Sequence, residues 1–142
     1  MQLGESFKRG IEITLVGLDE ALCDFEQWAQ GREQRSVFYS ERNALSPAER
    51  NTILSEVAGM REMLREIKDD LGLEGRVRDG ANDIWGKCAI LAVNLEELKG
   101  KHLAGYGEPP PELVEYLDPR MERLITSLNH IFRLTEKSKI MI

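Results

Sequence analysis

The sequence contains few of the residues from which catalytic and metal sites are usually built. It has two cysteines and two histidines in 142 residues. Cys23 and Cys88 lie inside helical patterns and form no CxxC motif, so we expect buried, reduced thiols and no structural zinc site. Neither His102 nor His130 has a glutamate three residues before it, as a di-iron bundle requires. We therefore predict no metal site and no cofactor.

Long hydrophobic runs and several familiar motifs are also missing. No stretch reaches the ~18 apolar residues of a membrane-spanning helix. The chain has no Gly-x-Ser-x-Gly nucleophile elbow, no Walker-type phosphate loop and no Gly-x-Gly-x-x-Gly turn. Its first residues lack the basic flank and apolar centre of a signal peptide. These absences predict a cytoplasmic protein and favour a function other than catalysis.

Acidic residues outnumber basic ones, by 25 Asp and Glu to 19 Lys and Arg, for a net charge of -6 at pH 7. This balance disfavours non-specific binding to nucleic acid or to an anionic membrane. The chain is 42% hydrophobic and 31% charged, which is typical of a folded, soluble helical protein. Its length is sufficient to bury a core without disulfides or metals. We therefore expect a single domain over residues 1–142.

Apolar residues recur at alternating spacings of four and three, which is the pattern of helices packed against helices. The longest such series extends from Val77 to His102 and predicts a helix over about 76–103. Similar series predict helices over about 6–30 and 47–71, and a fourth from about residue 113. Together they predict an all-α fold, a four-helix bundle of the up-and-down type with a long first connection.

Two helix ends are marked by local chemistry. Ser46-Pro47-Ala48-Glu49 is a capping box with proline at the first helical position, and Gly72 is suited to a left-handed stop. In the last helix Pro119 predicts either a kink or a fresh start capped by Asp118.

The first connection, about 31–45, is long for a helical bundle. Fully extended it would span about 50 Å, whereas the helix before it is about 39 Å long. This length is compatible with a crossover connection or with a continuation of the first helix.

Two segments are candidate interaction surfaces. Residues 88–93 are apolar on every side of their helix, which predicts self-association through Ile90 and Val93 unless they widen the core stripe. The first connection contains aromatic and basic residues of the types enriched at binding hot spots. These are Arg35, Val37, Phe38 and Tyr39. The alternative is that Val37 and Phe38 close one end of the core.

A second group of residues is a candidate small-molecule pocket. Arg78, Asn82 and Trp85 are spaced four and three apart and so share one helical face. Gly86 beside Trp85 would allow a close approach, and His102 is a further candidate in the bundle interior. The alternative is tight helix packing, with Trp85 covering the edge of the bundle.

The sequence thus favours a non-enzymatic interaction or regulatory module that acts through protein–protein contacts, with a homodimer favoured. The alternative is a small-molecule sensor or an enzyme with a pocket inside the bundle. A histidine phosphotransfer domain is a third candidate, but neither histidine is followed by the required Lys and Gly.

Overall fold

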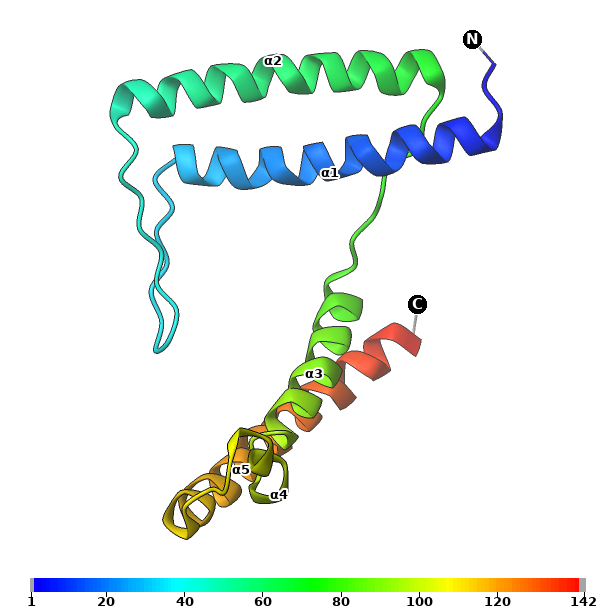
Figure 1. Ribbon diagram of the computed structural model, residues 1–142. Coiled ribbons are helices and arrows are strands. Elements are labelled where there is room, and N and C mark those ends of the chain that lie inside the picture. The colour runs from blue at the N-terminus through cyan, green and yellow to red at the C-terminus, as the bar shows by residue number, and fades with distance from the viewer. Residues whose placement is uncertain (1, 141–142) are drawn as a thin grey trace. The chain divides into compact units, whose positions relative to one another are not determined.

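The computed structural model describes the backbone of residues 2–140, and the side chains there except at 101, 104 and 137–140. Its four long helices are α1 (Glu5–Ala29), α2 (Pro47–Leu71), α3 (Gly80–Glu96) and α5 (Pro111–Ile140). A short helix α4 (Gly100–Leu103) and a 3-10 turn η1 (Ala104–Tyr106) lie between α3 and α5 (Figure 1). The predicted all-α fold with four long helices and a long first connection is confirmed. None of the described helices is both long and apolar enough to cross a membrane.

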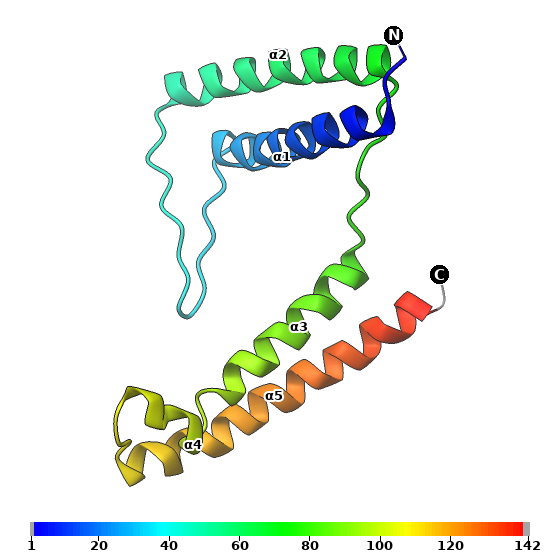
Figure 2. The same ribbon diagram turned by 45° about the vertical axis from the view of Figure 1, so that its right-hand side comes forward.

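Contacts divide the chain into two compact units, Met1–Arg76 and Val77–Ile142. The first unit is a hairpin in which α1 and α2 pack side by side and antiparallel (Figures 1 and 2). The second is a hairpin of α3 against α5, joined through α4 and η1. That the whole chain forms one domain stays a prediction.

The first hairpin is held together by a narrow apolar seam. Leu22 and Val57 are its largest fully buried side chains, and Ala29 is buried about two turns beyond Leu22 on α1. Arg61 of α2 forms an ion pair with Glu26 of α1 beside the seam. Cys23 was expected to be buried, but it is exposed, because it lies on the flank of α1, where Arg61 Nη2 donates to its sulfur at 3.8 Å.

Both predicted ends of α2 are confirmed. The Glu49 backbone N–H donates to Ser46 Oγ at 3.1 Å, and the Ser46 N–H donates to the Glu49 carboxylate at 2.8 Å. These two bonds satisfy donors that the first helical turn would otherwise leave unpaired. At the other end Gly72 adopts φ 61° and ψ 43°, a left-handed conformation that ends the helix.

The predicted third helix over 76–103 is too long at both ends. The Asp79 carboxylate accepts from the Asn82 N–H at 3.1 Å, so α3 begins at Gly80 and Val77 precedes it. The helix ends at Glu96, although the apolar spacing continues to His102. The apolar spacing continues past the end of α3 because a turn and a short helix follow it. They place Leu98 and His102 at a cleft that the last turns of α3 also line.

Helix α4 begins where the chain comes into contact with α5. The Gly100 N–H donates to Asp118 Oδ1 at 2.9 Å, so Asp118 caps α4 and does not start a new helix at Pro119. A Cβ atom at Gly100 would lie 2.8 Å from Val114 Cγ1 of α5, so a larger residue there would force Val114 or the backbone to shift. Helix α5 is unbroken through Pro119, which only removes the backbone bond to the carbonyl of Glu115.

The first connection is neither a crossover nor a continuation of α1. Residues 30–46 extend sideways from the end of the hairpin and fold back on themselves (Figures 1 and 2). Arg35 and Ser40 form an isolated antiparallel bridge, and the Ser36 N–H donates to the Tyr39 carbonyl at 2.7 Å. We call this segment the arm. The connection is long because it forms this arm. Helices α1 and α2 are neighbours, and a few residues would be enough to connect them.

We predict opposite effects of alanine at two glycines of the second unit. Gly100→Ala forces a Cβ against Val114 and should lower the free energy of unfolding by roughly 1–3 kcal/mol. Gly86→Ala, the matched control inside α3, meets no atom within 4 Å and should raise it by up to about 1 kcal/mol. Urea unfolding of the full chain, followed by circular dichroism, measures both. Equal stabilisation by the two variants would contradict the close approach of α4 to α5.

Candidate functional site

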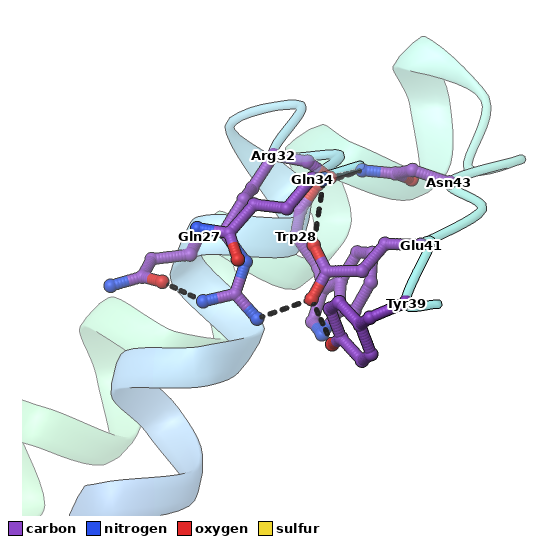
Figure 3. A network of polar contacts seen from close by, with 7 residues as sticks. All are labelled: Gln27, Trp28, Arg32, Gln34, Tyr39, Glu41 and Asn43. Carbon is purple, nitrogen blue, oxygen red and sulfur yellow. Dashed lines mark hydrogen bonds and ion pairs between the residues drawn. The ribbon is translucent and has the colours of Figure 1, made fainter. Parts of the chain in front are cut away.

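The arm is fixed at its base by a buried carboxylate. Glu41 is only 8% exposed and accepts three hydrogen bonds (Figure 3). The donors are the Gln34 N–H at 3.0 Å, the Tyr39 hydroxyl at 2.6 Å and Arg32 Nη2 at 3.5 Å. The Glu41 N–H in turn donates to the Gln34 carbonyl at 2.8 Å. These bonds join the outgoing and returning segments of the arm.

Asn43 connects the returning segment of the arm to the end of α1. Its side-chain amide donates to the carbonyl of Trp28 at 2.7 Å and to that of Arg32 at 3.1 Å (Figure 3). Its backbone N–H donates to a Glu33 carboxylate oxygen at 3.1 Å. The Trp28 carbonyl also accepts from the Gly31 N–H at 3.0 Å, so Asn43 adds a second donor where the arm departs from the helix.

Arg32 connects the carboxylate to the helix. Its guanidinium lies 5.1 Å from the centre of the Trp28 ring, within the range of a cation–π interaction. It also donates to the side chain of Gln27 in the last turns of α1. Arg32 therefore links α1, the Trp28 ring and Glu41, so the base of the arm is held from two directions.

The charges at the base are tuned by these contacts. The hydrogen bond from Tyr39, followed by that from the Gln34 N–H, lowers the pKa of Glu41 below its ordinary value of 4.5. The same bond raises the pKa of the Tyr39 hydroxyl, because its proton is held between the two oxygens. The pKa of Glu33 is lowered by the hydrogen bond from Arg35 and then by that from the Asn43 N–H.

The tip of the arm is apolar and uncovered. Val37 is 88% exposed and Phe38 is fully exposed, so neither side chain closes the core of the hairpin. Tyr39 keeps its ring more than half exposed while its hydroxyl bonds to Glu41. Arg35 stands beside the tip, paired with Glu33 at 2.9 Å. The arm thus presents two apolar side chains and a guanidinium from a fixed support.

A cleft of about 600 Å³ lies where the arm returns to the helices. Its apolar walls come from Phe25 and Trp28 of α1, Leu45 of the arm and Ile53 of α2. Arg42, Asn43 and Glu49 supply polar atoms at the same cleft. The tip is therefore separate from this cleft, which lies at the base of the arm.

The residues predicted as an interaction surface lie in two different units. Arg35, Val37, Phe38 and Tyr39 come together on the arm, as their adjacency in sequence requires. Ile90 and Val93 lie on α3 and are each more than half exposed. They therefore do not widen the stripe that α3 packs on α5, which contains the buried Cys88.

The residues predicted as a pocket lie in different parts of the second unit. Trp85 stacks on Phe132 of α5 with ring centres 5.1 Å apart, and Arg78 forms an ion pair with Asp83 at 3.0 Å. Asn82 and Gly86 lie in the N-terminal half of α3, about four and three turns before its end. The cleft of the second unit, about 870 Å³, lies further along the hairpin and contains only His102 of this group. Its apolar walls are Leu91, Leu95, Leu98, Leu124, Leu128 and Ile131.

Within residues 2–140, no three His, Cys, Asp or Glu side chains gather closely enough to hold a metal ion. Sequence reasoning missed Trp28, Glu41 and Asn43, whose roles depend on the fold of the arm. No spacing in the sequence marks them. The apolar wall of the second cleft does carry a signal, since Leu91 and Leu98, and Leu124 and Ile131, are seven residues apart.

We predict that the base of the arm loosens in acid. The bonds to Glu41 favour its ionised form, so its pKa is lower in the folded than in the unfolded chain. The resulting stabilisation is complete above the ordinary value of 4.5 and is lost as the pH falls through the lower folded value. In a Trp85→Phe background, the fluorescence of Trp28 should change over that acidic range.

The Glu41→Gln variant should lose this step because it carries no ionisable group at the base of the arm. Glu62→Gln, at an exposed glutamate on α2, is the matched control and should keep the step. An identical acid transition in Glu41→Gln would show that another carboxylate controls the arm.

Comparison with known protein families, with curated proteins and with solved structures gives no match to this chain. Its function is therefore inferred from its own contacts.

Proposed function

We propose that the protein is a non-enzymatic interaction module that binds protein surfaces through the tip of the arm. The observation that supports this most is the full exposure of Phe38 on a segment whose base is fixed by Glu41. Burying one large apolar side chain contributes about 1.5–3 kcal/mol. Phe38 would supply this free energy on binding a partner with an apolar pocket.

The fixed base of the arm increases the net free energy that this contact would contribute to binding. A flexible loop loses conformational freedom when it binds, at about 0.5–1.5 kcal/mol for each immobilised side chain. Here the two segments of the arm are already joined by the Arg35–Ser40 bridge and by the bonds of Glu41 and Asn43. Most of the ordering cost is therefore met when the chain folds, and the apolar tip is available for binding.

The titratable groups of the arm favour binding over catalysis. Glu41 accepts from three donors, and Glu33 accepts from Arg35 and from the Asn43 N–H. Carboxylates engaged in this way position the backbone and hold their charge, with pKa values below 4.5. Neither is poised to exchange a proton near neutral pH, as a general acid or base must.

The second unit supports a second candidate, the binding of an apolar small molecule. Its cleft of about 870 Å³ falls within the ~300–1,000 Å³ range of ligand sites. The walls are leucine and isoleucine, with His102, Asn94 and Ser127 as polar groups. Such a lining suits a hydrophobic ligand with one or two polar atoms.

We predict that the Val37→Ser, Phe38→Ser double variant loses its protein contacts but remains folded. The two side chains touch no core, so the circular dichroism spectrum should be unchanged. Any self-association seen by native mass spectrometry should weaken at least tenfold. Tyr106→Ser, which removes another exposed aromatic ring in the second unit, is the matched control and should bind like the native chain.

A photo-crosslinking amino acid at position 38 of the full chain tests the same proposal directly. It should form covalent adducts with a second copy or with another protein at a rate above that of the same group at position 106. A monomeric chain with no adducts above that control would refute the interaction role of the arm.

A further inference from the structure

The cleft at the base of the arm combines an aromatic wall with groups of both charges. Phe25 and Trp28 are three residues apart on α1, so they lie on one side of that helix. Leu45 of the arm and Ile53 of α2 add aliphatic walls. The volume of about 600 Å³ falls within the ~300–1,000 Å³ range of small-molecule sites. The cleft therefore has the size and the apolar lining to hold one ring or one branched aliphatic group.

The cation that lines the cleft is Arg42. In the part of the chain that the structure describes, its guanidinium makes no ion pair and no hydrogen bond. Its effect on other groups is small, since the pKa of Glu33 is lowered mainly by the hydrogen bond from Arg35, and Arg42 contributes least. The charge of Arg42 is therefore available to an anionic group placed in the cleft.

The anion that lines the same cleft is Glu49. Its Oε1 atom accepts from the Ser46 N–H at 2.8 Å in the cap of α2. This bond lowers the pKa of Glu49 below 4.5, so the carboxylate is charged at neutral pH. Among the described residues, none donates to its other oxygen, Oε2, and no ion pair joins it to Arg42. One oxygen of Glu49 therefore remains available to a cationic group.

The other cations at the base of the arm are engaged away from the cleft. Arg32 lies over the Trp28 ring and donates to Glu41. The Nε atom of Arg50 donates to the Leu45 carbonyl at 3.2 Å. Neither arginine lines the cleft. The cleft thus contains one positive and one negative group that do not neutralise each other, next to an apolar wall.

We propose that this cleft binds a free α-amino acid with an aromatic or branched aliphatic side chain. The side chain packs against Trp28 and the other apolar walls, the carboxylate pairs with Arg42, and the ammonium group pairs with Glu49. Arginine is well suited to this role because its planar guanidinium matches a carboxylate. The inference goes beyond the proposed function, because the cleft is separate from the tip of the arm.

The pair of charges selects this class of ligand over the alternatives. A neutral apolar molecule leaves both charges of the cleft unmatched. A carboxylic acid without an amine brings its charge near Glu49, and an amine without a carboxylate brings its charge near Arg42, each of which is unfavourable. The end of a peptide carries only one of the two charges. Only a free amino acid offers both charges on one carbon beside its side chain.

Titration of L-phenylalanine and two of its derivatives tests the proposal. The readout is the fluorescence of Trp28 in the full chain with Trp85→Phe, because Trp28 forms one wall of the cleft. L-Phenylalanine should bind saturably, with a Kd in the millimolar range or below. N-acetyl-L-phenylalanine lacks the ammonium group and L-phenylalaninamide lacks the carboxylate, so each should bind at least tenfold more weakly. Equal binding of the three, or no saturable response to L-phenylalanine, would overturn the proposal.

Two charge variants assign the two contacts. Arg42→Gln should weaken L-phenylalanine at least tenfold but should leave the binding of L-phenylalaninamide unchanged. Glu49→Gln keeps the cap of α2, because glutamine also serves at this position of a capping box. It should weaken L-phenylalanine but leave N-acetyl-L-phenylalanine unchanged. Arg35→Gln removes an arginine of the arm that does not line the cleft, and as the matched control it should bind like the native chain. An equal loss for all three ligands in Arg42→Gln would contradict the assigned contact.

Binding at the cleft and binding at the tip fail independently. The Val37→Ser, Phe38→Ser variant should bind L-phenylalanine like the native chain, because neither residue lines the cleft. If L-phenylalanine does not bind while position 38 still forms adducts, this inference fails and the proposed function stands. If L-phenylalanine binds with the expected selectivity while position 38 captures nothing, the proposed function fails and this inference stands.

Discussion

The conformation of the arm depends on one buried carboxylate. Glu41 brings together a backbone N–H, a tyrosine hydroxyl and an arginine that also stacks on Trp28. A charge buried without partners would cost several kcal/mol, so its donors must stay in place whenever the arm is folded. The exposed tip is positioned by these contacts, because its own side chains pack on nothing. The position of the tip therefore depends on electrostatics at the base.

A second constraint follows from the geometry of two-helix hairpins. A helix in a hairpin has one neighbour, which covers one edge of its apolar face. In the first unit this leaves Phe7, Leu18 and Phe25 exposed beside a thin seam around Leu22 and Val57. In the second it leaves the leucine-lined cleft between α3 and α5 open. Apolar surface of this kind is a favourable place for a further layer of protein or ligand.

Features that depend on nearby residues could be predicted from the sequence. The capping box at Ser46 and the stop at Gly72 involve atoms within four residues of each other, so the residue types there were sufficient to predict both helix ends. The end of α3 could not be predicted, because it is set by the contact of Gly100 with Val114 and Asp118 of α5. The arm could not be predicted for the same reason. Glu41, Asn43 and Trp28 are brought together only after α1 and α2 have paired.

The sequence by itself determined the helical class, the two ends of α2 and the presence of an aromatic, arginine-containing segment between the first two helices. These follow from periodicity and local hydrogen bonding, which act over a few residues. Only the tertiary structure decided that this segment is an ordered arm with Phe38 at its uncovered tip. It also decided that His102 lies in a different part of the second hairpin from Arg78 and Trp85. Contacts between residues distant in sequence set these positions, and the spacing along one strand or helix carries no record of them.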